Sequence, residues 1–409
     1  TPLLTFTALY NQNENIDGDV IGGDVDLVMT RVAFGAAPGL TVNQSSVGDG
    51  IENVYDPEMT GAFAGLVGDL FAENAAGYAD ALDQLSGEPY ASYLQSMTGL
   101  ASRFNGLIMD ETDCAVIKIG ETQPCRQETG GRIWGQINYG NLKKDGDAEA
   151  GGYKADDYYM ALGVDFAVSP DTTVGIAAAW VKHDLNFRHY NAKIKSDGFQ
   201  AGAYLVYDPG QLYAKAVLAY TDLNGKSRRS LAIGPSSTGT ITGSPDAHAF
   251  SVSGELGYRM DMGGSTVTPY LNLEYDATKL KSFTETGLAA ANLDVSGGSE
   301  DRFASQVGVK WAGQMGGLVP ELKLGWRHQF GDRQATVGAA FDVGVPGLAV
   351  TAEARVLGTL ENVKYTGGNR SISTDNQINL SGLVGVRYTF GQTPPPAPAP
   401  VPAPAPART

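Results

Sequence analysis

The stretch Asn379-Leu-Ser-Gly-Leu-Val-Gly-Val-Arg-Tyr-Thr-Phe390 alternates in character along its length. Leu380, Val384 and Val386 fall on one face of an extended chain, and Arg387 falls on the other. Successive side chains of a β-strand point to opposite faces, so this stretch has one apolar and one polar face. A strand between lipid and a hydrated lumen requires that pattern, because a charge facing lipid is costly. The stretch therefore predicts a transmembrane strand.

The same alternation recurs between residues 131 and 390. Tyr158, Met160 and Leu162 share a face, whereas Asp165 lies on the opposite one. Residues 250–260 and 318–327 behave alike, with their charges confined to one side. The charged residues that the alternation and the lumen assignment place inside are Arg132, Asp165, Lys215, Glu255, Arg259, Glu274, Glu321, Lys323, Arg327, Glu353, Arg355 and Arg387.

The connections between these stretches predict how many strands there are. Short turns alternate with longer polar connections, and five short plus six longer connections join twelve strands. The fold class is thus all-β, a twelve-stranded antiparallel transmembrane barrel over residues 131–390, with its short turns in the periplasm. A soluble sandwich or propeller would also alternate, but it would lack outward girdles of Tyr, Trp and Phe. The longer connections are expected near residues 141–157, 183–197, 222–247, 278–301, 329–334 and 359–377.

Composition excludes several classes of function. The 409 residues contain no apolar run near the roughly 20 needed for a membrane helix. The net charge of −16 argues against a nucleic-acid partner, which would need a basic face. The four histidines, at 183, 189, 248 and 328, are scattered and lack the Ser or Cys context of a catalytic triad. No phosphate loop or zinc motif appears, so we expect no metal, no cofactor and no enzyme in this chain.

The residues before the barrel divide into two regions. Residues 1–56 mix short β-like runs with turns, which suggests a β-solenoid-like remnant. Residues 57–130 are expected to form a helical junction, a pore helix and the loop with Cys114 and Cys125, with the helical pattern running to about residue 110. Its second helical run, over 90–109, has small side chains that would fit a narrow lumen. Cys114 and Cys125 then fit a local disulfide in an oxidising periplasm, although a metal pair or two free thiols are alternatives. The pore-helix residues are Tyr90, Ser96, Gly99, Ser102 and Asn105.

Four short motifs carry a resemblance to a known family. They are Leu-Thr-Val-Asn-Gln at 40–44, Leu-Ser-Gly-Glu at 85–88, Arg-x-Trp-x-Gln at 132–136 and Val-Arg-Tyr-Thr-Phe at 386–390. In this order the chain resembles the classical, type V autotransporters of Gram-negative bacteria. The resemblance implies an outer-membrane translocator, set in lipid and lipopolysaccharide, that moves its own N-terminal passenger to the cell surface and anchors it there. It also implies that Tyr388 and Phe390 signal to the barrel-assembly machinery, served by periplasmic chaperones, and that the C-terminus is periplasmic.

Two features leave alternatives open. Residues 391–409 are rich in Pro and Ala and resemble linkers to peptidoglycan-binding domains, although a dispensable tail would look the same. A plugged porin or structural barrel tied to peptidoglycan is therefore the alternative function. Some autotransporters cleave themselves at an Asn in the pore, which makes Asn105 in Asn-Gly a candidate, but the paired-Asn motif is absent. Any enzymatic activity is expected in a passenger outside this chain.

Overall fold

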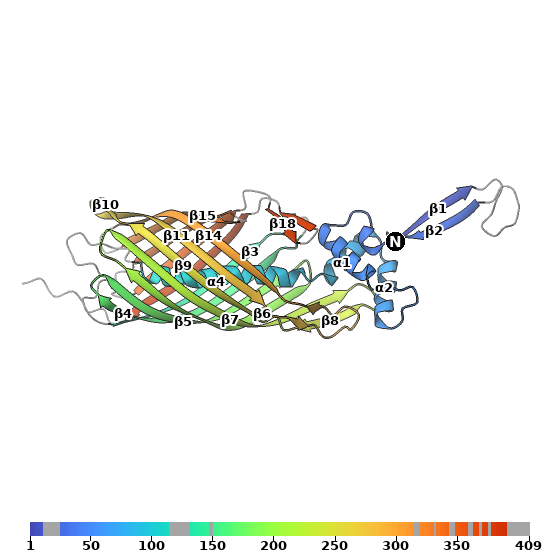
Figure 1. The fold of residues 1–409 in the computed structure, drawn as a ribbon, viewed down its shortest axis with the longest axis horizontal. Coiled ribbons are helices and arrows are strands. Elements are labelled where there is room, and N and C mark those ends of the chain that lie inside the picture. The colour runs from blue at the N-terminus through green and yellow to red at the C-terminus, as the bar shows by residue number, and fades with distance from the viewer. Residues whose placement is uncertain are drawn as a thin grey trace, which may run out of the picture.

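The computed structural model shows a long antiparallel sheet that closes around a helix (Figure 1). It describes residues 1–10, 25–113, 131–146, 150–313, 319–330, 333–342, 348–358, 363–367, 370–374 and 378–390. For residues 319–321 and 333–390 the description covers the backbone alone. The predictions for Cys114, Cys125 and the tail 391–409 concern residues outside the described ones.

Every strand of the barrel pairs antiparallel with the strand on each side of it. The circuit runs from β3 through the strands in chain order to β20, which pairs with β3 again. The predicted closed barrel is thus confirmed. The sheet has 14 strands in all, and two of them are additional to the closed circuit. These are β8 (Thr238–Gly243), which pairs only with β7, and β10 (Met260–Asp261), which pairs only with β11. The circuit consists of β3 (Gly131–Lys144), β4 (Tyr153–Ser169), β5 (Thr172–Phe187), β6 (Ala192–Tyr207), β7 (Leu212–Ala232), β9 (Ala247–Tyr258), β11 (Ser265–Leu280), β14 (Gly298–Gly313), β15 (Val319–Gln329), β16 (Arg333–Asp342), β17 (Leu348–Gly358) and β20 (Ile378–Phe390).

Exposed aromatic residues mark the two edges of an apolar band on the outside of the barrel. On β4 the outward Tyr158 and Phe166 are eight residues apart, and Phe199 and Tyr207 repeat this spacing on β6. At about 3.3 Å per residue and a strand tilt of about 40°, eight residues rise roughly 20 Å, close to the height of a lipid-facing band. Asp165 on β4 points inward and is buried, as its place in the alternation predicted.

At the end of the barrel near β8, several strands continue beyond the apolar band, and there the apolar side chains face inward and the polar ones outward. Leu185 and Ile194 are buried inside, whereas Lys193 and Lys195 are exposed outside. The expected connections are therefore partly wrong. Residues 141–144, 153–157, 183–187, 192–197 and 222–232 belong to strands, and β8 completes a long hairpin with β7. The sequence criterion missed these segments because it sought apolar residues on the outward face, and here that face meets water.

The N-terminal region is a hairpin followed by three helices. Its elements are β1 (Leu4–Tyr10), β2 (Val25–Arg31), the 3₁₀ turn η1 (Phe34–Ala36), α1 (Val42–Glu52), α2 (Ala62–Ala72) and α3 (Ala75–Leu85). Since β1 and β2 are antiparallel neighbours, they form a hairpin and not the stacked parallel rungs of the expected solenoid. The helical region also begins before the predicted residue 57, because Thr41 and Gln44 form a capping box that starts α1.

The three helices pack on the far end of the β7–β8 hairpin (Figure 1). Leu66 and Leu70 of α2 and Leu82 of α3 share an apolar core with Leu231 and Ile241 of the hairpin. The loop between β11 and β14 also contributes Ala291 to this core. We call residues 34–85 the cap. The loop between β11 and β14 carries the two-residue strands β12 (Phe283–Thr284) and β13 (Asp294–Val295), which pair with each other. In the connection between β17 and β20, β18 (Val363–Gly367) pairs with β19 (Arg370–Thr374).

Candidate functional site: the pore helix and the lumen

Helix α4 (Glu88–Glu111) runs along the inside of the barrel (Figure 1). Its first turn contains Glu88 and Pro89, both favourable at a helix N-terminus. The helix contacts β5, β6, β7, β9, β11 and β14. Tyr93, Met97 and Phe104 are completely buried against the wall. The predicted helix in the lumen is therefore present.

At the cap end, α4 meets a buried ion pair. Arg229 of β7 donates to both carboxylate oxygens of Glu285, at 2.8 and 2.6 Å. Its third nitrogen donates to the carbonyl of Gln84 at the end of α3, at 2.7 Å. The Tyr90 hydroxyl contacts Glu285 and lies 2.8 Å from the Ser227 hydroxyl. One pair of charges therefore joins the hairpin, the β11–β14 loop, the cap and the start of α4.

Along the first half of α4, a series of polar side chains links the helix to the wall, and no motif in the sequence indicates it. The Ser96 hydroxyl lies 2.9 Å from Nε2 of His183, and Nδ1 of His183 contacts Asp157. Asp157 is also bound by Arg103 of α4. The order Ser, His, Asp is that of an acyl-transfer triad. All three are enclosed between helix and wall, however, so the contacts serve to hold α4. The three residues are far apart in the sequence, and they meet because β4 places Asp157 opposite His183 of β5, next to α4.

Arginines of β14 and β15, on another part of the wall, also bind α4. Arg302 of β14 donates to the Thr98 carbonyl at 3.1 Å and pairs with Glu274 and Asp276. Arg327 of β15 donates to the Ser102 hydroxyl at 3.1 Å and also pairs with Glu274. Of these, Glu274 and Arg327 were predicted inside. The alternation also allows Arg302, but no motif marks it.

Asn105 and Gly99 occupy different surroundings on α4. Asn105 is fully buried, and its Oδ1 accepts from the Ser251 hydroxyl at 3.3 Å. None of the described carboxylates forms a recorded hydrogen bond with Asn105. Gly99 lies on an exposed side of the helix, and apart from its neighbours and the helix backbone no described atom lies within 4 Å of the position a Cβ would take.

At the opposite end, cations of the wall surround the acidic last turn of α4. Lys215 donates to the Met109 carbonyl at 3.0 Å, and Lys323 pairs with Asp110 at 2.9 Å. Lys310 pairs with Asp113 at 2.7 Å and with Glu255 at 2.6 Å. Cations next to a helix C-terminus offset the negative end of its dipole. The helix is therefore fixed at both ends as well as in the middle.

The remaining predicted residues fall into two groups. Arg132 pairs with Asp165 at 2.7 Å and with Glu111 at 3.3 Å, and Arg259 pairs with Asp208 at 2.6 Å. The side chains of Glu321, Glu353, Arg355, Arg387, Tyr388 and Phe390 lie outside the described residues. Within the described part, the structure has no group of three or more His, Cys, Asp or Glu that could hold a metal ion.

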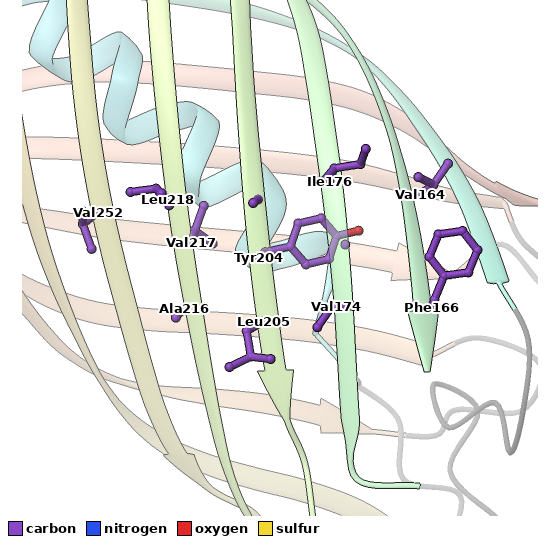
Figure 2. Close-up of a pocket in the computed structure, with 12 residues that line it drawn as sticks. Val164, Phe166, Val174, Ile176, Tyr204, Leu205, Ala216, Val217, Leu218 and Val252 are labelled. Atoms are coloured by element: carbon purple, nitrogen blue, oxygen red, sulfur yellow. The ribbon is translucent and has the colours of Figure 1, made fainter. Parts of the chain in front are cut away.

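In the wall beside the C-terminal half of α4, glycines leave room for aromatic rings that lie against their backbone. A Cβ on Gly175 would lie 2.2 Å from the Tyr204 ring, and one on Gly163 would lie 2.2 Å from Trp134. The Tyr204 hydroxyl donates to Asp165 and accepts from Trp134, both at 2.8 Å. Figure 2 shows this part of the wall, where an apolar hollow includes Phe166, Ile176 and Leu205.

Comparisons with known proteins agree with this architecture. The autotransporter β-domain family model matches residues 133–361, more than half of the chain. Outer membrane protein A of Rickettsia conorii is 29% identical over 203 residues, which cover 46% of this chain and 10% of that protein. Outer membrane protein B of Rickettsia japonica is 24% identical over 310 residues, covering 70% of this chain and 18% of that protein. The chain thus spans a minor part of the length of these relatives.

One solved structure supports the fold. The translocator domain of the autotransporter NalP from Neisseria meningitidis superposes with a TM-score of 0.59 at 17% identity, covering 74% of this chain and 99% of that one. At that identity the likeness concerns the fold.

Proposed function

Since this chain belongs to the autotransporter family, and its barrel is an outer-membrane translocator, we propose that α4 is the last part of an exported segment, held in the pore through which that segment passed. The observation that carries this proposal is the set of contacts along α4. Tyr90 contacts Glu285 at one end of the helix. In the middle, Arg103 pairs with Asp157 and Arg302 donates to the Thr98 carbonyl, and at the other end Lys215 donates to the Met109 carbonyl. Because wall residues bind the helix along its whole length, we expect it to stay inside the barrel after export.

The orientation of the exported segment is part of the same proposal. Short connections such as 170–171 and 208–211 lie at the barrel end where α4 finishes, and the β7–β8 hairpin and the cap lie at the other. Outer-membrane barrels have short periplasmic turns and longer extracellular loops. We therefore assign residues 1–87 to the cell surface and the end of β20 to the periplasm.

Family membership also supports partners that the described residues do not reach. We propose that Tyr388 and Phe390 serve as the signal for the barrel-assembly machinery, and that the passenger of this translocator is the chain's own N-terminal part. The family match does not favour the peptidoglycan-linked barrel. We assign no reaction to Asn105, because its described neighbours include no acid bound to it.

Cross-linking in cells tests the position of α4. The hydroxyls of Thr98 on α4 and Thr278 on β11 are 3.1 Å apart. In a background with Cys114 and Cys125 changed to Ser, Thr98→Cys/Thr278→Cys should form a disulfide in outer-membrane fractions. The matched pair Thr98→Cys/Thr268→Cys, with the second cysteine ten residues away on the same inner face, should not. Equal cross-linking of both pairs, or none in either, would place α4 outside the pore.

Protease treatment of intact cells tests the orientation. Residues 1–87 should be digested from outside, while a fragment containing the barrel stays in the membrane. If residues 1–87 are protected in intact cells and are cleaved only after permeabilisation, the assignment is reversed.

A further inference from the structure

Above the apolar band, β6 and β7 bring four cations together on the outside of the barrel. Lys195 lies directly opposite Lys226 in the strand register, and Lys193 lies directly opposite Arg228. All four side chains are exposed. Like charges directly opposite each other on neighbouring strands destabilise a sheet. Two such pairs lie side by side, and an anionic partner would offset their repulsion.

The chain places two carboxylates near these cations, Asp184 and the exposed Asp197, which lies two residues from Lys195 on the same face of β6. Within the described part of the chain, none of the four forms an ion pair, and Arg228 has one long hydrogen bond to the Thr240 hydroxyl, at 3.5 Å. Asp184 on β5 lies opposite Lys195 but pairs with Lys182, at 3.6 Å. We call Lys193, Lys195, Lys226 and Arg228 the basic patch.

The height of the basic patch above the membrane selects the partner. Phe199 and Tyr220, with ring centroids 6.4 Å apart, mark the edge of the apolar band on these two strands. Lys195 is four residues beyond Phe199, and Lys226 is six beyond Tyr220, which on strands tilted by about 40° raises them roughly 10 and 15 Å above the edge of the band. The headgroup layer of a phospholipid extends only about 5–8 Å beyond the hydrocarbon. The patch therefore lies above phospholipid phosphates.

We propose that the basic patch binds the anionic sugars of the outer-leaflet glycolipid, lipopolysaccharide, through their phosphate and carboxylate groups. This inference rests on the proposed orientation, in which this end of the barrel faces the cell surface. Lysine and arginine on adjacent, fully paired strands hold their charges at fixed spacing, which suits a headgroup with several anionic groups. Binding offsets the cross-strand repulsion and attaches the upper barrel, with its cap, to the lipid surface.

The test uses the purified full chain in neutral detergent, titrated with lipopolysaccharide and, separately, with phosphatidylglycerol. Lys195→Gln/Lys226→Gln removes one like-charged pair and should weaken lipopolysaccharide binding about 30-fold, at about fivefold per cation next to an anionic lipid surface. Lys279→Gln/Lys281→Gln removes two exposed cations elsewhere on the same rim and should bind like the unchanged chain. Lys195→Arg/Lys226→Arg should also retain binding.

Two results would overturn the inference. One is equal loss of lipopolysaccharide affinity in Lys195→Gln/Lys226→Gln and Lys279→Gln/Lys281→Gln, or no loss in either. The other is binding of phosphatidylglycerol as tight as that of lipopolysaccharide. Heat-dependent gel migration of each variant confirms that its barrel is folded. Failure of the proposed orientation would appear separately, as protection of residues 1–87 from external protease in the unchanged chain.

Discussion

Arg229 is the residue on which the junction between cap, hairpin and pore helix depends. Its guanidinium and the Glu285 carboxylate are almost completely buried and bind each other at two positions. Removing one partner of a buried ion pair leaves an uncompensated charge, which costs about 3–5 kcal/mol. Arg229→Met should therefore loosen the cap, and limited proteolysis should cut residues 62–85 at least tenfold faster. Arg229→Met/Glu285→Leu should restore much of the protection, and similar rates for both variants would contradict the role of charge.

Glu52 gives the cap a dependence on pH. Arg31 donates to its two carboxylate oxygens, at 2.8 and 2.5 Å, and the amide of Phe34 donates at 3.0 Å. The hydrogen bonds from Arg31, followed by that from the amide, lower the pKa of Glu52 from 4.5 to about 2. The stabilisation is therefore fully present above pH 4.5 and is lost as the pH falls through about 2.

Hydrogen exchange at the Phe34 amide measures this effect. After correction for intrinsic exchange, its protection should be constant from pH 7 to 5 and should decline toward pH 2. Glu52→Gln should lower the protection at pH 6, whereas Glu58→Gln, on an exposed residue, should not. A Phe34 amide that exchanges equally in all three proteins would show that Glu52 does not hold it.

Single residues also show where sequence reasoning stops. Alternation alone placed Asp165, Glu255 and Lys215 inside, because strand parity decides the face. It could not pair Ser96 with His183, because that contact depends on how far α4 is inserted and on the register of β4 and β5. The partners of predicted charges, such as Lys310 for Glu255 and Asp113 for Lys215, were missed for the same reason.

At the scale of elements, the β7–β8 hairpin supports the cap through one of its faces. Leu231 and Ile241 are buried against α2 and α3, whereas the side chain of Ala232 points to solvent. Leu231→Asp should therefore detach the cap, because it buries a charge without a partner, whereas Ala232→Asp on the opposite face should not. Proteolysis within residues 62–85, with the barrel fragment intact, measures detachment. Equal sensitivity of the two variants would mean that the hairpin face does not decide docking.

The elements that the sequence predicted well are those whose environment is uniform along their length. Strands such as β9 and β15 face lipid on one side throughout the band, so their alternation is plain. By contrast, β6 and β7 pass from lipid into water, and there the outward residues change from Phe199 and Tyr220 to Lys195 and Lys226. The pattern reverses while the strand continues, and a rule based on a single environment ends the strand too early.

For the whole molecule, closure of the sheet predicts resistance to denaturants. Each strand of the circuit has a neighbour on both sides, and β20 returns to β3, so no backbone edge is left open. The unheated protein in detergent should migrate differently on a gel from the boiled protein. Migration that does not change with boiling would contradict closure.

The last prediction concerns the pore that α4 fills. A helix of 24 residues is about 36 Å long at about 1.5 Å per residue, enough to cross the roughly 30 Å hydrocarbon core. Its contacts with β5 and β14, on separate parts of the wall, show that it occupies the lumen and does not lie against the outside. Deleting residues 1–110 should therefore open a larger and steadier ion conductance in planar bilayers, while the barrel remains heat-modifiable.

The matched control is deletion of residues 1–86, which removes the hairpin and the cap but keeps α4. This variant should conduct much less than the one without residues 1–110, because Arg103, Thr98 and Asp110 of α4 retain their wall partners. The comparison separates occlusion by the helix from occlusion by the cap. If the two deletions open equal conductances, the cap closes the barrel and α4 does not fill it. If deletion of residues 1–110 leaves the conductance of the full chain unchanged, the lumen is blocked by something other than these residues.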